Sequence, residues 1–157
     1  MIIIITGTPG TGKTTLSKKI SKKLNFKYIS GNTIIKKYSL IEGYDTIKKC
    51  NIVDEIKFSK SVTKYCKPNE NYIIDSHLSH YIDSTKVKLC IVCKCNLKTL
   101  EKRLKKRKYS KQKIKDNLEC EIFETCLNEA ITNKHKIIVS NNLQEISKKI
   151  KSITNKN

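Results

Sequence analysis

Short apolar runs alternate along this chain with longer segments in which apolar residues recur every three or four positions. The runs are typical of buried strands, and they cover residues 2–6, 26–29, 72–75, 87–93 and 137–139. The longer segments have the periodicity of helices. Short strands that alternate with helices indicate an α/β fold, with a five-stranded, largely parallel sheet covered on both faces.

Polar capping residues mark where several of the predicted helices begin. The first helix covers residues 13–24 and carries Leu16, Ile20 and Leu24 on one face. Asp54 and Asn96 are predicted N-caps of helices whose faces consist of Phe58, Val62 and Tyr65, and of Leu97, Leu100 and Leu104. Ser110 is predicted to cap the longest helix, with a face made by Ile114, Leu118, Ile122, Cys126, Leu127 and Ala130. A final helix carries Leu143, Ile146, Ile150 and Ile153.

One segment, residues 30–51, has only a weak pattern, and within it Gly43-Tyr44-Asp45 is predicted to be a turn.

The chain shows no repeat, linker or break in composition. At 157 residues it is predicted to form a single domain covering residues 1–157. A domain of this size buries roughly 70% of its unfolded surface, so its core needs no disulfide or metal.

The chain is strongly basic, with 33 Lys and Arg against 14 Asp and Glu and a net charge of +19. Such a charge raises nonspecific affinity for nucleic acid or anionic surfaces and does not determine the fold. All but two of the basic residues are lysines, and the exceptions are Arg103 and Arg107. The even spread of lysine indicates compositional drift rather than a dedicated basic patch.

The seven cysteines are an odd number and follow no secretory leader, which favours reduced thiols and a cytoplasmic location, or a nuclear one in a eukaryote. Cys90, Cys93 and Cys95 lie in an apolar run, where cysteine behaves as a small core residue. Cys120 and Cys126 do not form the second matched pair that a zinc site would need. The apolar residues 1–5 are too short for a signal peptide or a membrane span.

One loop carries three of the five glycines, directly between the first predicted strand and the first predicted helix. Gly7-x4-Gly12-Lys13-Thr14 matches the Walker A pattern in full. Its backbone N–H groups can face one anion, and the helix adds its positive N-terminal end. Lys13 would then contact the β- and γ-phosphates of a nucleoside triphosphate, and Thr14 would ligate Mg²⁺. An ordinary glycine turn before a helix is the alternative.

An acidic residue ends the third predicted strand. Asp75 follows apolar residues, at the position typical of a Walker B carboxylate that holds a Mg²⁺-bound water. Since side chains alternate along a strand, His77 is expected on the same side, where it could position water or sense the γ-phosphate. The alternatives are a turn residue for Asp75 and a solvated loop histidine for His77.

The two arginines are four residues apart, hence on one helical face. A planar guanidinium meets the oxygens of a transferring phosphoryl group in fixed geometry, and lysine replaces it poorly. Arg103 and Arg107 are therefore candidate catalytic residues. A solvated basic helix face is an equally open interpretation, because residues 101–115 contain nine Lys or Arg. The same run is the best candidate for RNA contact, although only Tyr109 could stack a base.

Together these residues resemble the adenylate kinase isoenzyme 6 family, called coilin-interacting nuclear ATPase protein in animals. The resemblance extends from Ile5 to about Ala130. Within the family, the chain is most similar to the archaeal adenylate kinase form. The motifs that carry it are Thr6–Thr15, Gly43-Tyr-Asp45, Val53-Asp-Glu55, Asp75-x-His77, Arg103-Leu-x-x-Arg-x-Tyr109 and Asp116-Asn-x-x-Cys-Glu-Ile-Phe123.

The resemblance implies a P-loop nucleoside monophosphate kinase fold, with a monophosphate-binding segment at about residues 30–53 and a short lid at about 106–115. It implies the reaction ATP + AMP = 2 ADP with Mg²⁺, ATP hydrolysis, and a role in small ribosomal subunit maturation and rRNA processing through a platform ribosomal protein. The implied nucleotide-binding residues are Gly10, Thr11, Gly12, Lys13, Thr14, Thr15 and Arg107. Asp75 and His77 match its Asp-x-His element.

Three features depart from the family pattern. Lys36 replaces an arginine that meets the acceptor phosphate, and Lys108 replaces a lid glycine, which would stiffen the lid. The charge of +19 contrasts with the acidic animal relatives and favours direct RNA contact.

The sequence thus predicts a kinase that uses Lys13, Asp75, His77, Arg103 and Arg107 for catalysis. An ATPase switch that acts mainly in ribosome assembly is the alternative, and an RNA-binding protein that merely carries a nucleotide is a third hypothesis.

Overall fold

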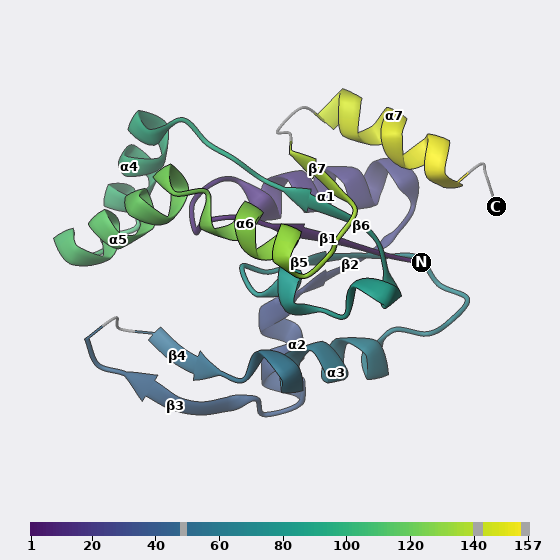
Figure 1. Ribbon diagram of the computed structural model, residues 1–157, viewed down its shortest axis with the longest axis horizontal. Coiled ribbons are helices and arrows are strands. Elements are labelled where there is room, and N and C mark those ends of the chain that lie inside the picture. The colour runs from purple at the N-terminus through teal and green to yellow at the C-terminus, as the bar shows by residue number, and fades with distance from the viewer. Residues whose placement is uncertain (48–49, 140–142, 155–157) are drawn as a thin grey trace.

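The computed structural model describes residues 1–47, 50–139 and 143–154. It contains a five-stranded sheet in the order β2-β5-β1-β6-β7, in which all neighbouring strands are parallel (Figure 1). These strands are β1 (Ile2–Thr6), β2 (Lys27–Ser30), β5 (Tyr72–Asp75), β6 (Val87–Val92) and β7 (Ile137–Val139). The predicted α/β architecture with a five-stranded parallel sheet is confirmed.

Helices cover both faces of the sheet, as its nearly continuous apolar strands require. The helices are α1 (Lys13–Leu24), α2 (Gly31–Lys37), α3 (Glu55–Tyr65), α4 (Leu97–Lys106), α5 (Lys111–Ile122), α6 (Thr125–Thr132) and α7 (Leu143–Thr154). Two short 3₁₀ turns, η1 (Ser79–Tyr81) and η2 (Ser84–Lys86), precede β6.

The central strand β1 shows how the two faces are separated. Ile3 and Ile5 pack in a core with residues of α1 and α7, including Ile146 and Ile150. Ile2 and Ile4 face the opposite core, where α2, α3 and α6 contribute Ile34, Ile35, Phe58, Val62 and Ala130. Each fully buried isoleucine contributes roughly 1.5–3 kcal/mol to folding, so β1 is fixed firmly on both sides. The loop that follows β1 is therefore held on a rigid strand.

The burial predicted for the final helix and for the cysteines of residues 90–95 can be compared with the structure. Ile146 and Ile150 of α7 are buried, while the side chains of Leu143 and Ile153 lie outside the described residues. Cys90 and Cys93 are buried, whereas Cys95 lies beyond the end of β6 and is half-buried, packed against the small core cluster of α4 and α5. No helix among the described residues is long and apolar enough to cross a membrane.

The weakly patterned segment 30–53 forms α2 and an antiparallel hairpin of β3 (Ile41–Asp45) and β4 (Cys50–Val53). The hairpin projects away from the five-stranded sheet (Figure 1). The prediction that Gly43-Tyr44-Asp45 is a turn is wrong, because these residues belong to β3. Gly43 accompanies a shift of strand register, and the Asp45 carboxylate accepts a hydrogen bond from the N–H of Ile47 just after the strand. Residues 48 and 49 lie outside the described part.

The helix predicted after Ser110 is in fact two helices, α5 and α6, so the prediction of one long helix is wrong. Glu124, between them, has a left-handed backbone with φ of 53°, and its carboxylate is paired with Lys94. The apolar face is not continuous either, since Ile122 is exposed whereas Ala130 is buried. The break lets α6 pack on the sheet while α5 packs against α4 through Ile114.

Gly31 at the start of α2 gives a test of how tightly the segment 30–53 is joined to the sheet. A Cβ at this position would lie 2.5 Å from Cβ of Ser76, which follows β5. We therefore expect Gly31→Ala to lower the free energy of unfolding by about 1–3 kcal/mol, measured by urea denaturation. Gly43→Ala is the matched control, because its Cβ would meet only Ile52 Cδ1 at 3.7 Å. Equal effects of the two variants would contradict the prediction.

Candidate active site

The loop between β1 and α1 has the curled backbone that the Walker A pattern requires. Gly7, Gly10 and Gly12 all have positive φ, between 99° and 136°. At Gly7 a Cβ would lie 2.4 Å from the carbonyl oxygen of Cys93, so only glycine fits there. The Lys13 Nζ donates to the carbonyls of Gly7 and Thr8 at 2.7 and 3.1 Å. Burial lowers the pKa of Lys13, and the charge of Asp75 opposes that shift.

Asp75 lies where β5 ends beside β1, next to the start of α1. The Thr14 hydroxyl donates to Asp75 Oδ2 at 2.5 Å, so the two residues predicted to hold Mg²⁺ are in direct contact. The Tyr28 hydroxyl, from the neighbouring strand β2, donates to the same oxygen at 3.2 Å. Burial and the nearby Asp75 charge raise the pKa of Tyr28, so it remains a donor at neutral pH. The sequence analysis missed Tyr28, because only the strand order places it beside Asp75.

A cavity of about 610 Å³ opens in front of this loop. Its lining includes Lys13, Thr14, Thr15, Asp75 and His77, and it also takes in Ser30, Asn32, Cys50, Arg107, Tyr109, Lys113, Asp116 and Asn117. It is therefore bordered by the P-loop, by the segment 30–53, and by the segment 106–115 with the helix that follows. These three segments are far apart in sequence, but they come after β1, β2 and β6, whose carboxyl ends lie at the same edge of the parallel sheet.

His77 lines this cavity together with Asp75, although it lies in the turn after β5 and not on the strand itself. Its side chain is exposed to the cavity. Loss of surrounding solvent lowers the pKa of His77, the charge of Lys13 lowers it further, and Asp75 opposes both. The ring is therefore neutral at neutral pH, with a nitrogen able to accept a proton.

The two arginines differ in their surroundings. Arg103 donates to the carbonyl of Gly10 at 3.1 Å and contacts Cys95 Sγ at 3.4 Å. It borders a second cavity, of about 430 Å³, together with Gly10, Thr11, Gly12 and Thr15. Arg107 lines both this cavity and the larger one. Arg103 is not among the described residues that line the larger cavity, so the structure brings Arg107 but not Arg103 to that cavity.

Comparison with known proteins places this site in a family. A family model described as an AAA domain matches residues 3–124. A relative from Dictyostelium discoideum named "Adenylate kinase isoenzyme 6 homolog" is 36% identical over 138 residues, which cover 87% of this chain and 78% of that protein. One from Pyrococcus furiosus named "Putative adenylate kinase" is 38% identical, covering 88% of this chain and 73% of its own length. The chain belongs to the adenylate kinase isoenzyme 6 family.

Solved structures of P-loop kinases share the fold. Shikimate kinase from Acinetobacter baumannii, in complex with shikimate, has a TM-score of 0.62 at 14% identity and covers 98% of this chain and 92% of its own. Deoxyadenosine kinase from M. mycoides with bound dATP has a TM-score of 0.54 at 21% identity and covers 99% of each chain. At these identities the likeness shows the fold alone. Family and fold together make this adenylate kinase isoenzyme 6 relative a phosphotransferase.

The structure shows the surroundings of Lys36 and Lys108, the two residues at which the sequence departs from the family pattern. Lys36 is exposed on α2 and is not among the described residues that line the larger cavity. Lys108 has a left-handed backbone with φ of 57°, a conformation that glycine adopts without strain. Lys108 therefore holds the turn after α4 at a conformational cost.

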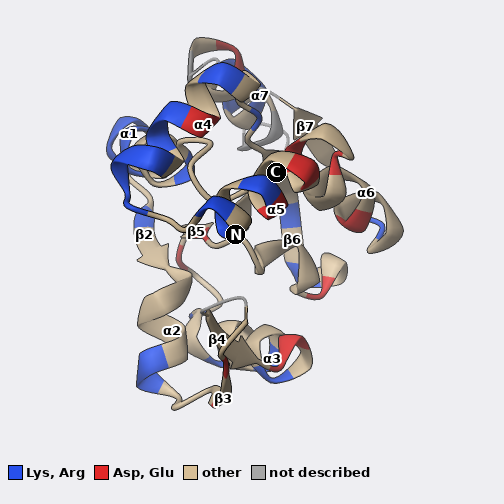
Figure 2. Ribbon diagram, turned by 90° about the vertical axis from the view of Figure 1, so that its left-hand side faces the viewer, with Lys and Arg blue, Asp and Glu red and all other residues tan. Residues whose placement is uncertain are grey.

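Basic residues gather on the helices that surround the P-loop. Lys and Arg occur on α1, α4 and α5 in the face shown in Figure 2. On α1 and α4 the exposed ones include Lys18, Lys22, Lys23, Lys98, Lys102, Lys105 and Lys106. The charge is thus spread over several helix faces around the site rather than concentrated in a single loop.

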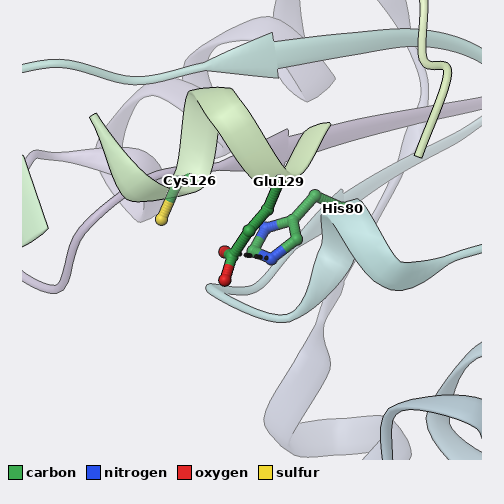
Figure 3. Close-up of side chains that lie close together, drawn as sticks. All are labelled: His80, Cys126 and Glu129. Carbon is green, nitrogen blue, oxygen red and sulfur yellow. Dashed lines mark ion pairs between the residues drawn. The ribbon is translucent and has the colours of Figure 1, made fainter. Parts of the chain in front are cut away.

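Near the end of β1 lies a partly buried cluster, made by His80, Cys126 and Glu129, that the sequence did not predict (Figure 3). His80 in η1 is 2% exposed, with Nδ1 2.7 Å from Thr6 Oγ1 and Nε2 2.9 Å from a carboxylate oxygen of Glu129. Burial lowers the pKa of His80 to about 4, with His77 adding to the effect, so the ring is neutral at neutral pH. Among the described residues, His80, Glu129 and Cys126 are the one group of three side chains of metal-binding type. The His80 contacts join α6 to the end of β1.

Proposed function

We propose that this chain is a nucleoside monophosphate kinase that transfers the γ-phosphoryl group of Mg·ATP to AMP. The observation that carries the proposal is the shared cavity of about 610 Å³, because residues of the P-loop and of the segment 30–53 line it together. A phosphoryl transfer enzyme needs donor and acceptor held in line within one enclosure. The family membership adds support, since relatives carry adenylate kinase names.

The donor side of the proposed reaction rests on the P-loop. Its backbone N–H groups would hold the β- and γ-phosphates, and Lys13 would exchange its carbonyl partners for phosphate oxygens. Thr14 and Asp75 fit a Mg²⁺ ion, because both offer hard oxygen donors at one point. The bound ion would neutralise charge on the phosphates. Tyr28 would keep the Asp75 carboxylate oriented.

On the acceptor side, the segment 30–53 would bind the monophosphate and the segment 106–115 would act as a lid. Ser30 and Asn32 from the first segment face Arg107 and Lys113 from the second around the cavity. Arg107 would meet the transferring group, and closure of the lid would exclude water. Arg103 would act on the donor side, from its place beside Gly10. Because Lys36 is not on the lining, Lys113 and Arg107 are the cations best placed for the acceptor phosphate.

An acceptor panel tests this proposal. Mg·ATP would be offered with AMP, CMP, UMP or GMP, and with shikimate and deoxyadenosine as acceptors of the two structural neighbours. The proposal expects ADP formation to depend on a nucleoside monophosphate, with AMP used best. Turnover with shikimate or deoxyadenosine, and none with any monophosphate, would overturn it.

His77 favours a second activity, an ATPase switch. Its neutral ring lines the cavity together with Asp75, and the nearby charge of Lys13 lowers its pKa. From this place the ring could position an attacking water. We expect His77→Ala to lower phosphate release without AMP about 100-fold while AMP phosphorylation stays near the wild-type rate. Phosphate release and ADP formation measured on the same sample provide the control. Equal loss of both activities would mean that His77 serves the kinase reaction itself.

The proposed partners are a platform ribosomal protein of the small subunit and the pre-ribosomal particle, as the family resemblance implies. The basic faces of α1 and α4 support direct contact with RNA. Binding to a small-subunit rRNA fragment, measured with and without ATP at several salt concentrations, separates the hypotheses. Binding that weakens with salt and responds to ATP supports an assembly role. Binding that ignores ATP would favour an RNA-binding protein that merely carries a nucleotide.

A further inference from the structure

A buried carboxylate connects the P-loop to the helix on the other side of the cavity. Glu121, near the end of α5, is only 8% exposed. One of its oxygens, Oε2, accepts a hydrogen bond from the Thr8 hydroxyl of the P-loop at 2.6 Å. The other, Oε1, accepts one from the backbone N–H of Cys95 at 2.7 Å. Both bonds go to a charged acceptor, so each is stronger than a bond between neutral groups.

The two partners of Glu121 belong to the rigid frame of the site. Thr8 lies within the first turn of the P-loop, where its carbonyl accepts from Lys13 Nζ. Cys95 lies three residues after β6, close to the point where Gly7 packs on the carbonyl of Cys93. The carboxylate therefore fixes the P-loop and the end of β6 to one position on α5.

The same helix faces the acceptor side of the cavity along its length. Lys113, Asp116, Asn117 and Cys120 of α5 all line the larger cavity. Asn117 and Glu121 are four residues apart, hence on neighbouring turns of one side of the helix. Immediately after Glu121 the helix ends and the chain turns at Glu124. A movement of α5 when the acceptor binds would therefore be passed to Thr8 through Glu121.

We propose that Glu121 is a positioning residue that couples the P-loop to the acceptor side of the site through Thr8. This proposal rests on the proposed kinase function for its second part only. Its first part concerns Mg·ATP binding: the carboxylate holds the loop backbone in the shape that receives the phosphates. Its second part concerns the acceptor: through α5, occupancy of the acceptor side changes the affinity of the P-loop for Mg·ATP.

A double-mutant cycle on Mg·ATP binding tests the first part. We expect Glu121→Ala and Thr8→Val each to raise the Kd for Mg·ATP about tenfold, measured by calorimetry. Combining them should add little, because both remove the same contact. Thr8→Ser, which keeps the hydroxyl, should restore most of the affinity that Thr8→Val loses. Glu119→Ala is the matched control, since Glu119 lies on the same helix but is exposed.

Thermal melts of each variant show whether it is folded at the temperature of the binding experiment. If Glu121→Ala is not folded, Glu121→Gln replaces it in the cycle, with a smaller rise in Kd because a neutral amide replaces the charged acceptor. Independent effects, in which the double variant shows the product of the two single changes, would overturn the positioning role. So would a Glu121 variant that binds Mg·ATP like Glu119→Ala.

The second part is tested by measuring the Kd for a Mg²⁺ complex of a non-hydrolysable ATP analogue with and without saturating AMP, because Mg·ATP itself would react with AMP. In the wild type we expect AMP to change this Kd, and in the Glu121 variant the ratio should approach one. An unchanged ratio in the variant would overturn the coupling. If AMP has no effect on this Kd in the wild type, the coupling is overturned, whereas the Thr8–Glu121 cycle still decides the positioning role and the acceptor panel still decides the acceptor.

Discussion

Replacing Lys13 by methionine is expected to lower kcat/KM for Mg·ATP about 1000-fold, the largest effect of any single change at this site. Lys13 Nζ lies against the carbonyls of Gly7 and Thr8, and burial already lowers its pKa. Methionine keeps the length of the side chain but removes the charge that would meet the β- and γ-phosphates. Steady-state ADP formation, together with a direct Mg·ATP binding measurement, gives the result.

Lys22→Met is the control for the Lys13 experiment. Lys22 lies on the same helix α1 but is exposed and is not among the described residues that line either cavity. The same change there should leave turnover near the wild-type value. Normal Mg·ATP binding by Lys13→Met would show that the Walker A assignment of the loop is wrong.

The second large effect is expected from Arg107→Lys, which should lower kcat about 100-fold. Arg107 is the arginine that lines both cavities, which under the proposed function are the places of the donor and the acceptor. Lysine keeps the charge but loses the planar pair of donors that matches a phosphoryl group. The Kd for Mg·ATP should change much less than kcat. Turnover measured at saturating ATP and AMP separates the two quantities.

Two variants make the Arg107 result specific. Lys106→Arg changes the exposed neighbouring position and should have no effect. Arg103→Lys tests the other arginine, whose bond to the Gly10 carbonyl predicts a larger effect on Mg·ATP affinity than on kcat. Wild-type turnover by Arg107→Lys would contradict the argument that this chain retains its two arginines for phosphoryl transfer.

The parallel sheet and the P-loop could be predicted because their signals are local. An apolar run, a glycine loop and a Lys-Thr pair lie within residues 2–14. The hairpin of β3 and β4 could not be predicted, because its sequence lacks the apolar alternation that marks a strand. In the structure its strands bury little, since Ile41, Tyr44 and Ile52 are all exposed.

The break between α5 and α6 has a different origin. The periodicity of apolar residues continues across Phe123 and Glu124, but the helix is interrupted at Glu124, which has a left-handed backbone, and α6 packs on the sheet while α5 packs on α4. Tyr28 and Glu121 were missed for a related reason. Their partners Asp75 and Thr8 are 47 and 113 residues away in the chain, so no spacing pattern could reveal them.

Phosphorus-31 NMR of the protein with Mg·ATP, recorded with and without AMP, tests the central claim most directly. If the chain is a nucleoside monophosphate kinase with a slower ATPase activity, AMP strongly accelerates ADP formation, two ADP appear for each ATP consumed by transfer, and inorganic phosphate stays a minor product. ADP formed at the same rate with or without AMP, with one inorganic phosphate for each ADP, would contradict this account and would identify the protein as an ATPase.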